Sequence, residues 1–248
     1  MNEVQGIKNV YITQVHGNRK SDYTPYIFSE EEISALLKQA SSFQVCNSRA
    51  NPNMRNVISC LYVMLYCTGM RVSEALGLKL EDVSLDEFII IVTETKNDKQ
   101  RLIPITKSLA MRCRDYLKQR VSVHKSYFFD SGSDYRCGRI DKKQAYRYFR
   151  KLLESSGIPH RGKGEGPRLH DFRSTFAVHS LQKLGNLSGD INAYLEYLSL
   201  YMGHQSIYET QDYLWLTDKL AADMLEKTSA DTAFISEEFN WKAVSFDV

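Results

Sequence analysis

Long apolar runs are missing from this sequence of 248 residues. The longest run, 60–67, is far shorter than the roughly 20 residues that a membrane-spanning helix needs, and it suits a buried helix instead. The polar stretch 1–20 lacks the apolar core of a secretory signal. We therefore expect a cytoplasmic chain that has no membrane partner.

Paired cysteines are missing as well. The five cysteines form no CxxC motif, and their odd number leaves one cysteine over. This argues against a disulfide framework and against a zinc site, and it favours reduced thiols. The sequence also has no acidic cluster with the spacing of metal ligands. We therefore expect neither a metal ion nor a metal-dependent reaction.

The sequence also lacks a large net charge, because its formal net charge at pH 7 is only +2. The distribution is more informative, since basic residues dominate between Arg136 and Arg168 and acidic residues dominate near the C-terminal end. A locally basic surface attracts a polyanion even when the total is near zero. The candidate polyanion-binding residues are Lys142, Lys143, Arg147, Arg150, Arg161, Lys163 and Arg168. Charge alone does not separate this reading from a solvated helix face.

The apolar spacing predicts a mainly helical domain over 27–216, preceded by a polar arm or linker remnant over 1–26. Ser29 and Glu32 stand at the two positions of a capping box, so a helix should begin there. Asp141 is a plausible cap of a later helix. Apolar residues recur every three or four positions in the other predicted helices, which are 54–68, 71–76, 108–120, 141–156, 170–184, 190–202 and 206–216.

Between these helices the pattern changes to that of strands. The runs 87–95 and 100–105 are rich in β-branched residues and flank the polar turn 96–99, which predicts an antiparallel β-hairpin. Pro104 suits the end of an edge strand, because proline cannot donate a hydrogen bond to a ladder. The expected fold class is α+β, mainly helical with one small antiparallel sheet.

Residues that could carry chemistry stand in separate short motifs. Arg71 follows the helix-ending Gly69, and Glu74 lies three residues further, where it could orient the arginine. Lys96 stands at the predicted hairpin tip. Each feature alone is more typical of a surface ion pair or a solvated lysine than of a catalytic site.

Two further motifs come later in the chain. His170 and Arg173 are three residues apart on a predicted helix and should share a face. His204 follows a glycine, and Tyr213 stands nine positions after it. Taken singly, these also fit a salt-bridged helix surface and a core tyrosine.

In combination and in this order, the motifs resemble the tyrosine recombinase family, the phage-integrase-like enzymes. The segments that carry the resemblance are TGMRVSEALGLKLEDV, TKNDKQRLIPI, LHDFRSTFAVH and YMGHQSIYETQDYL. The resemblance covers roughly 26–216. It implies the catalytic fold of that family with a three-stranded antiparallel sheet, and a site-specific recombinase or integrase that works through a 3′-phosphotyrosyl intermediate.

The resemblance also implies a role for each motif residue. Tyr213 is the nucleophile. Arg71, Arg173 and His204 bind the scissile phosphate, and His170 assists proton transfer. These roles suit the residue types, because guanidinium groups give planar, bidentate donors to phosphate oxygens and stabilise the charge of the transition state.

Lys96 is, by the same resemblance, the general acid that protonates the leaving 5′ oxygen. A tyrosine hydroxyl has a pKa of about 10, so the nucleophile needs a base or a positive field to attack. Neither a metal nor a nucleotide cofactor is required, because the phosphotyrosyl bond retains the energy of the phosphodiester. The implied partner is double-stranded DNA, which the basic residues between Arg136 and Arg168 would contact.

The sequence departs from the family pattern in three places. Ser174 stands where family members often have a second histidine. The stretch between Arg173 and His204 is long, as in recombinases of transposons and other mobile elements. The arm over 1–26 is too short for the helical core-binding domain that usually precedes the catalytic one. This fits either a naturally short recombinase or a truncated product.

Two alternatives remain open at this level. One is a type IB topoisomerase, which relaxes DNA with the same kind of tyrosine. The other is a non-catalytic remnant that only binds DNA or joins the assembly of another recombinase of the same element. In the family reading, we expect a homo-oligomer, dimer or tetramer, on DNA in a bacterial nucleoid.

The tail over 217–248 has no apparent core of its own. Thr217 can cap a short helix, and the aromatic residues beyond it are spaced through an acidic segment. Exposed aromatics need a docking surface. The family resemblance implies that such a tail packs on a neighbouring protomer, and folding back on its own domain is the alternative.

Overall fold

The structure is a computed structural model, and it confirms a mainly helical α+β fold with one small sheet. It describes residues 23–43, 54–94, 99–120, 126–131, 138–160, 162, 166–188, 191–204 and 206–217. The helices are α1 (Glu30–Ser42), α2 (Met54–Thr68), α3 (Val72–Gly77), α4 (Lys107–Gln119), α5 (Lys142–Ser155), α6 (Asp171–Ser188) and α7 (Ile191–Met202). A further helix covers 208–217. Among the described helices, none combines the length and apolar character that a membrane span requires.

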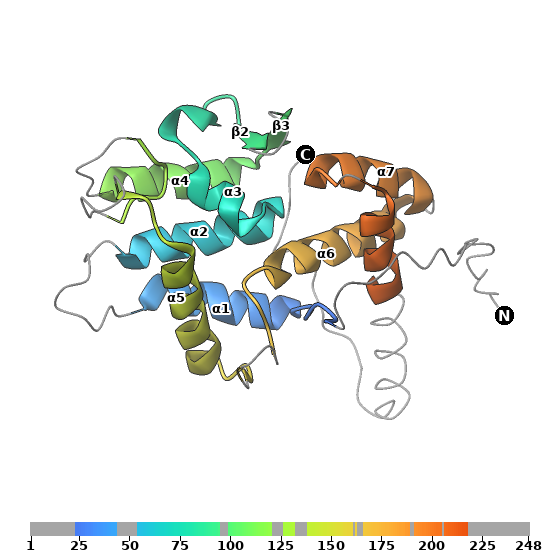
Figure 1. Ribbon diagram of the computed structural model, residues 1–248, viewed down its shortest axis with the longest axis horizontal. Coiled ribbons are helices and arrows are strands. Elements are labelled where there is room, and N and C mark those ends of the chain that lie inside the picture. The colour runs from blue at the N-terminus through green and yellow to red at the C-terminus, as the bar shows by residue number, and fades with distance from the viewer. Residues whose placement is uncertain are drawn as a thin grey trace.

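Helix α2 is the centre of the larger hydrophobic core. Its residues Val57, Leu61 and Met64 are fully buried, and it packs against α1, α4 and α6 (Figure 1). The predicted bounds of this helix are confirmed. Gly69 ends it with a φ of 60°, and a Cβ at this position would collide with the ring of Phe176 in α6. Glycine therefore allows the end of α2 to approach α6 closely.

Helix starts follow the capping residues that the sequence indicates. The Ser29 hydroxyl accepts from the Glu32 N–H at 3.2 Å, and the Glu32 carboxylate accepts from the Ser29 N–H at 2.9 Å, so the predicted capping box is confirmed. Asp141 caps α5 by accepting from the Lys143 N–H at 3.3 Å. Such local signals set where these two helices begin.

The sheet has the order β1-β2-β3, with β1 (Val83–Ser84), β2 (Ile89–Glu94) and β3 (Lys99–Pro104) all antiparallel. The short 3-10 helix η1 (Leu80–Asp82) leads into it. Pro104 is the last residue of the edge strand β3, as predicted. The predicted start of β2 at Glu87 is wrong, because Phe88 takes a φ of 56° in the preceding turn and the strand begins only after it.

Helix α6 differs from the prediction at both ends. It begins at Asp171, so His170 lies in the turn before the helix rather than on it. It continues to Ser188, beyond the expected end at Leu184. Together with α7 and the helix 208–217, it encloses a second hydrophobic cluster, of which Tyr213 is a member (Figure 1).

The described segment before α1, residues 23–29, is hydrogen-bonded to α6. The Tyr23 hydroxyl donates to the Asp171 carboxylate at 2.5 Å, and the Phe28 N–H donates to the Thr175 hydroxyl at 3.1 Å. The Arg168 guanidinium lies 3.3 Å from the centre of the Tyr23 ring. Since Asp171 and Thr175 are one helical turn apart, this segment runs along α6 and helps to place the first turn of that helix.

Candidate active site

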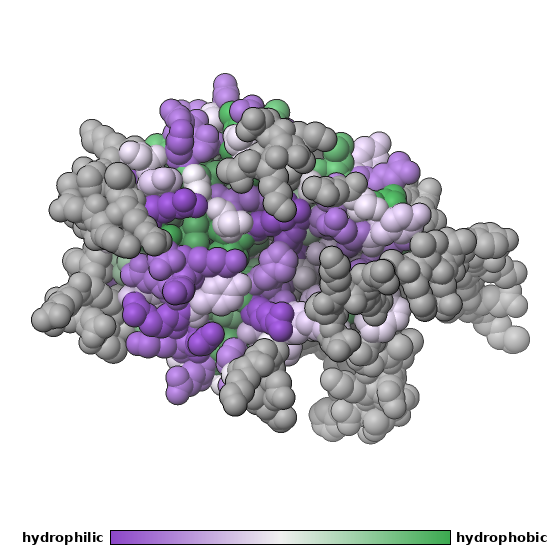
Figure 2. Space-filling model, in the orientation of Figure 1, coloured by the Kyte–Doolittle hydropathy of each residue, from purple (hydrophilic) through white to green (hydrophobic). Residues whose placement is uncertain are grey.

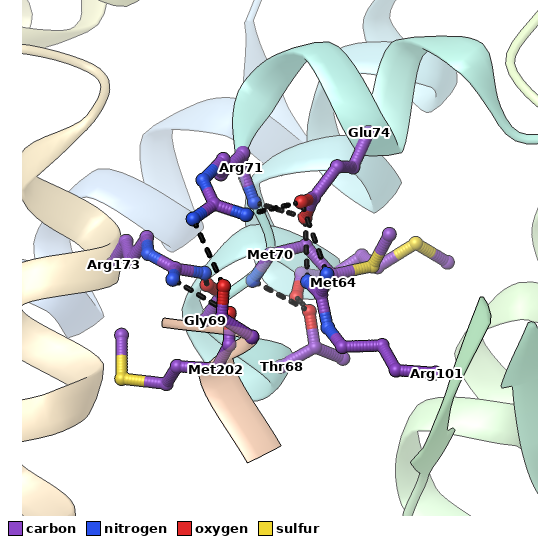
Figure 3. Close-up of polar contacts among 10 residues, drawn as sticks. Met64, Thr68, Gly69, Met70, Arg71, Glu74, Arg101, Arg173 and Met202 are labelled. Carbon is purple, nitrogen blue, oxygen red and sulfur yellow. Dashed lines mark hydrogen bonds and ion pairs between the residues drawn. The ribbon is translucent and has the colours of Figure 1, made fainter. Parts of the chain in front are cut away.

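Arg173 is held in place by the ends of two other helices. It lies in the first turn of α6 and is buried, and its two Nη atoms donate to the carbonyl oxygens of Gly69 and Met202, each at 2.7 Å (Figure 3). Carbonyl groups at helix C-termini lack intrahelical partners and carry partial negative charge, so they attract a cation. Burial and the positive charge of Arg71 lower the pKa of Arg173 to about 10.

Arg71 stands at the N-terminal end of α3 and is oriented by Glu74. Its Nη1 donates to Glu74 Oε1 at 2.9 Å, and its backbone N–H donates to Oε2 at 2.8 Å. Its Nη2 reaches the carbonyl oxygen of Gly203 at 3.2 Å. The side chain remains 34% exposed. The two arginines therefore lie side by side where α2 and α7 end (Figure 3).

His204 and Tyr213 form one stacked pair. The His204 Nδ1 lies 2.7 Å from the Thr210 hydroxyl, and its ring stacks on Tyr213 with centroids 5.9 Å apart. The His204 N–H donates to the carbonyl oxygen of Ser199 in α7 at 3.0 Å. The Thr210 contact and the stacking thus fix the imidazole ring relative to the tyrosine, and the backbone bond ties His204 to α7.

Tyr213 is buried against Arg173 and Ser174. Burial raises the pKa of the Tyr213 hydroxyl, while the charge of Arg173 and the Ser174 side chain act in the opposite direction. Arg173 therefore favours the phenolate that an attacking tyrosine must form. Tyr208, in contrast, is 55% exposed.

The surroundings of His170 and His204 lower the pKa values of both imidazoles. Desolvation, together with the charges of Arg173 and Arg71, lowers the pKa of His204 to about 3, and the same causes lower the pKa of His170, although its side chain is exposed. Both imidazoles are therefore neutral near pH 7. A site with this much positive charge favours binding of an anion.

The structure thus brings six of the predicted site residues to one place, although they stand far apart in the sequence. They are Arg71, Glu74, His170, Arg173, His204 and Tyr213. The Arg173–Gly69 bond, for example, joins residues 104 positions apart. Lys96, the remaining predicted catalytic residue, lies outside the described residues.

The predicted polyanion-binding set falls mainly on α5. Lys142, Lys143, Arg147 and Arg150 on this helix are exposed, and so is Arg168. Figure 2 shows hydrophilic residues gathered over α5 on the viewed face. Lys142 also contributes to the lowered pKa of His170, which places this basic surface next to the site. Arg161 and Lys163 lie outside the described residues.

Sequence reasoning missed Arg101 in β3. Its Nη1 and Nη2 donate to the Glu74 carboxylate at 3.1 and 2.7 Å. A signal for it exists, because Arg101 alternates with Ile103 and Ile105, both of which are buried. A charged residue in the inward register of a strand indicates a buried ion pair.

Known proteins resemble this chain both in sequence and in structure. Residues 27–220 match the model of the phage integrase family. The chain is 32% identical over 208 residues to a putative integrase/recombinase, y4rB, of Sinorhizobium fredii, covering 82% of this chain and 65% of that protein. It resembles the crystal structure of XerA recombinase with a TM-score of 0.61 and 25% identity, covering 88% of this chain and 68% of the other.

A lambda integrase tetramer bound to a Holliday junction shares the fold, with a TM-score of 0.55, 18% identity and coverage of 78% of this chain and 49% of the other. The chain spans less than two thirds of the length of the first relatives it matches, 65% for y4rB and 61% for tyrosine recombinase XerA of Pyrococcus horikoshii.

Proposed function

The chain belongs to the phage integrase family, and we propose from this premise that it is a site-specific DNA recombinase. It would cut and rejoin DNA strands through a covalent bond between Tyr213 and the 3′ phosphate. One observation carries the proposal. A buried tyrosine, a stacked histidine and two arginines meet at the ends of α2 and α7.

The arginines suit the binding of a scissile phosphate. Arg173 is anchored through two carbonyl oxygens and Arg71 through Glu74, so their orientation is set before substrate arrives. Preorganised donors stabilise charge as it develops in the transition state. His204 would add a further donor to the same phosphate.

Proton transfer completes the reaction. The Tyr213 hydroxyl loses its proton as its oxygen attacks phosphorus, and neutral His170 is suited to assist that step. Lys96 would protonate the leaving 5′ oxygen. The reverse steps, with a different 5′ hydroxyl, rejoin the strand without a metal or a nucleotide cofactor.

A nicked suicide substrate tests this function, because loss of the short cleaved fragment traps the covalent protein–DNA adduct. A mobile-element recombinase forms the adduct only at its own sites. A type IB topoisomerase would instead relax supercoiled DNA that has no such site. A non-catalytic remnant would bind DNA and form no adduct.

The partners follow from the same proposal. The substrate is double-stranded DNA, and the solved lambda integrase tetramer on a Holliday junction supports assembly of several copies on DNA. Other recombinases of the same element are further candidate partners. A bacterial cytoplasm, with the protein on the nucleoid, is the setting in which such a reaction would take place.

Neutralising Lys142, Lys143 and Arg147 together with glutamine should weaken binding to every DNA sequence equally. These exposed side chains contact phosphates rather than base edges in this proposal. Each lost phosphate contact should reduce the slope of log affinity against log salt by about 0.9. Fluorescence anisotropy over a salt series measures the slope, and Lys118→Gln, on the exposed face of α4, serves as the matched control. An unchanged slope in the triple variant would leave α5 as a merely solvated surface.

DNA binding should tighten as the pH falls from neutrality toward about 3, the pKa of His204 in the free protein. A bound phosphate favours the charged imidazolium, so it raises the pKa of His204, which is about 3 in the free protein. The complex then holds more protons than the free protein, and affinity rises with acidity by at most about tenfold per pH unit for each proton taken up.

Anisotropy at a series of pH values measures this dependence. His204→Gln should flatten it, whereas His179→Gln, which removes a histidine bonded to Tyr66 on another face of α6, should not. Parallel pH profiles for wild type and His204→Gln would rule out proton uptake by His204.

The domain boundaries lead to a separate proposal about the tail. The catalytic domain would span 27–216, and the segment 217–248, apart from Thr217 at the end of the helix 208–217, would dock on a neighbouring protomer. Deleting 230–248 should leave a folded protein that binds one DNA site normally but forms dimers or tetramers on DNA at least about tenfold more weakly, a loss of about 1.4 kcal/mol. Sedimentation on DNA tests this, and unchanged assembly would contradict the exchange of tails.

A further inference from the structure

The Glu74 carboxylate is clamped from two sides. Its Oε1 accepts from Nη1 of Arg71 at 2.9 Å and from Nη1 of Arg101 at 3.1 Å. Its Oε2 accepts from the backbone N–H of Arg71 at 2.8 Å and from Nη2 of Arg101 at 2.7 Å. Arg101 therefore binds the carboxylate with both ends of its fork, while Arg71 binds the same two oxygen atoms from α3 (Figure 3).

The ion pair between Arg101 and Glu74 is largely buried. The side chains of Arg101 and Glu74 are only 12% and 9% exposed. Arg101 shares the inward face of β3 with Ile103, so an apolar side chain would fit the same register. Buried ion pairs contribute little net stability compared with well-packed apolar residues. Stability alone therefore does not explain a charged pair at this position.

The clamp has a direct effect on Arg71. Burial raises the pKa of Glu74, but the hydrogen bonds and charge of Arg101, and then those of Arg71, hold it below its ordinary value. The carboxylate thus stays ionised and fixed. An arginine as exposed as Arg71, paired with a mobile carboxylate, would sample many orientations. Paired with a clamped one, it keeps a single orientation.

We propose that Arg101 is a positioning residue for the recombination reaction, acting through Glu74 on Arg71. This inference rests on the proposed function. Arg101 clamps the carboxylate, the carboxylate holds the guanidinium of Arg71, and Arg71 then meets the scissile phosphate in one geometry. In this proposal Arg101 acts without contacting the DNA, because both Nη atoms of its fork bind Glu74.

The first test compares adduct formation by full-length variants under single-turnover conditions. Arg101→Ala should lower the rate about tenfold to a hundredfold, as expected for a displaced phosphate-binding group, with DNA affinity nearly unchanged. Arg101→Lys keeps a cation next to buried Glu74 and protects the fold, but it loses the fork, so its rate should lie in between. Arg114→Ala removes an arginine that pairs with the exposed Asp86 and is the matched control. Wild-type rates in folded Arg101→Ala and Arg101→Lys would overturn the inference.

The route of action is tested by a double-mutant cycle. If Arg101 acts through Glu74, the double variant Arg101→Ala/Glu74→Gln should be no slower than Glu74→Gln alone. If the double variant is instead slower by the product of the two single-variant factors, that route is contradicted.

A second substrate tests which group Arg101 serves. A substrate with a bridging 5′ sulfur needs little protonation of its leaving group and should rescue Lys96→Ala but not Arg101→Ala. Equal rescue of both would mean that Arg101 acts on the hairpin that carries Lys96, and not on Arg71.

A spectroscopic measurement separates this inference from the proposed function. The Arg71 Nε–Hε signal in a ¹⁵N NMR spectrum, assigned by its loss in Arg71→Lys, should report a restrained guanidinium in wild type and in Arg114→Ala. It should broaden or shift toward the free arginine position in Arg101→Ala. Wild-type protein that forms no adduct would end the proposed function, whereas an Arg71 signal unchanged by Arg101→Ala would end the inference.

Discussion

Tyr213→Phe should fold, bind DNA as the wild type does and form no covalent adduct on a nicked suicide substrate. The ring of Tyr213 belongs to the cluster of α6, α7 and the helix 208–217, and it stacks on His204. Phenylalanine retains both contacts, so the fold should survive. It lacks the hydroxyl, which is the only nucleophilic atom of this residue, so the loss of adduct should be complete.

Tyr208→Phe is the matched control, because the same hydroxyl is removed from the same helix. Tyr208 is exposed, whereas Tyr213 is buried beside Arg173. Its variant should cleave at the wild-type rate. An adduct formed by Tyr213→Phe but not by Tyr208→Phe would show that the nucleophile was assigned to the wrong tyrosine.

Arg173→Lys should lower the rate of adduct formation by roughly two to three orders of magnitude, as the loss of a preorganised donor typically does. Arg173 places one Nη atom on the carbonyl oxygen of Gly69 and the other on that of Met202. A lysine ammonium carries the same charge but has no planar fork, so it cannot keep both anchors and also present a bidentate face to a phosphate.

Single-turnover cleavage measures this effect, and thermal unfolding shows whether the variant is folded. Arg114→Lys makes the same substitution in an arginine of α4 that pairs with exposed Asp86, and it should cleave normally. Cleavage by folded Arg173→Lys within about threefold of the wild type, less than the roughly tenfold that corresponds to 1.4 kcal/mol, would exclude Arg173 from the phosphate site.

Much of the fold could be predicted from the sequence, because its signals are local. The bounds of α2 follow from a continuous apolar stretch that ends at Gly69, and the start of α1 follows from a capping box. The structure departs from the predicted elements where the local signal is weak. Phe88 adopts a positive φ that bulky residues rarely take, so the start of β2 could not be anticipated.

The site residues could be named from the sequence because the family motifs carry them in a fixed order. The contacts between these residues could not be predicted from the sequence. His170 was expected on the helix and lies in the turn before it, and Arg101 was not identified as part of the site at all. Arg101 and Glu74 are 27 positions apart on a strand and a helix, and no local pattern links them.

The sequence by itself therefore determined where the helices lie, though not the ends of α6, and it determined the edge strand, the family and the set of candidate catalytic residues. Only the tertiary structure decided that the carbonyl oxygens at the ends of α2 and α7 anchor Arg173, and that Arg101 clamps the partner of Arg71. The physical reason is the range of the interactions. Caps and apolar periodicity act within about one helical turn, whereas a buried cation must find its acceptors wherever packing brings them, here from residues as much as 104 positions away.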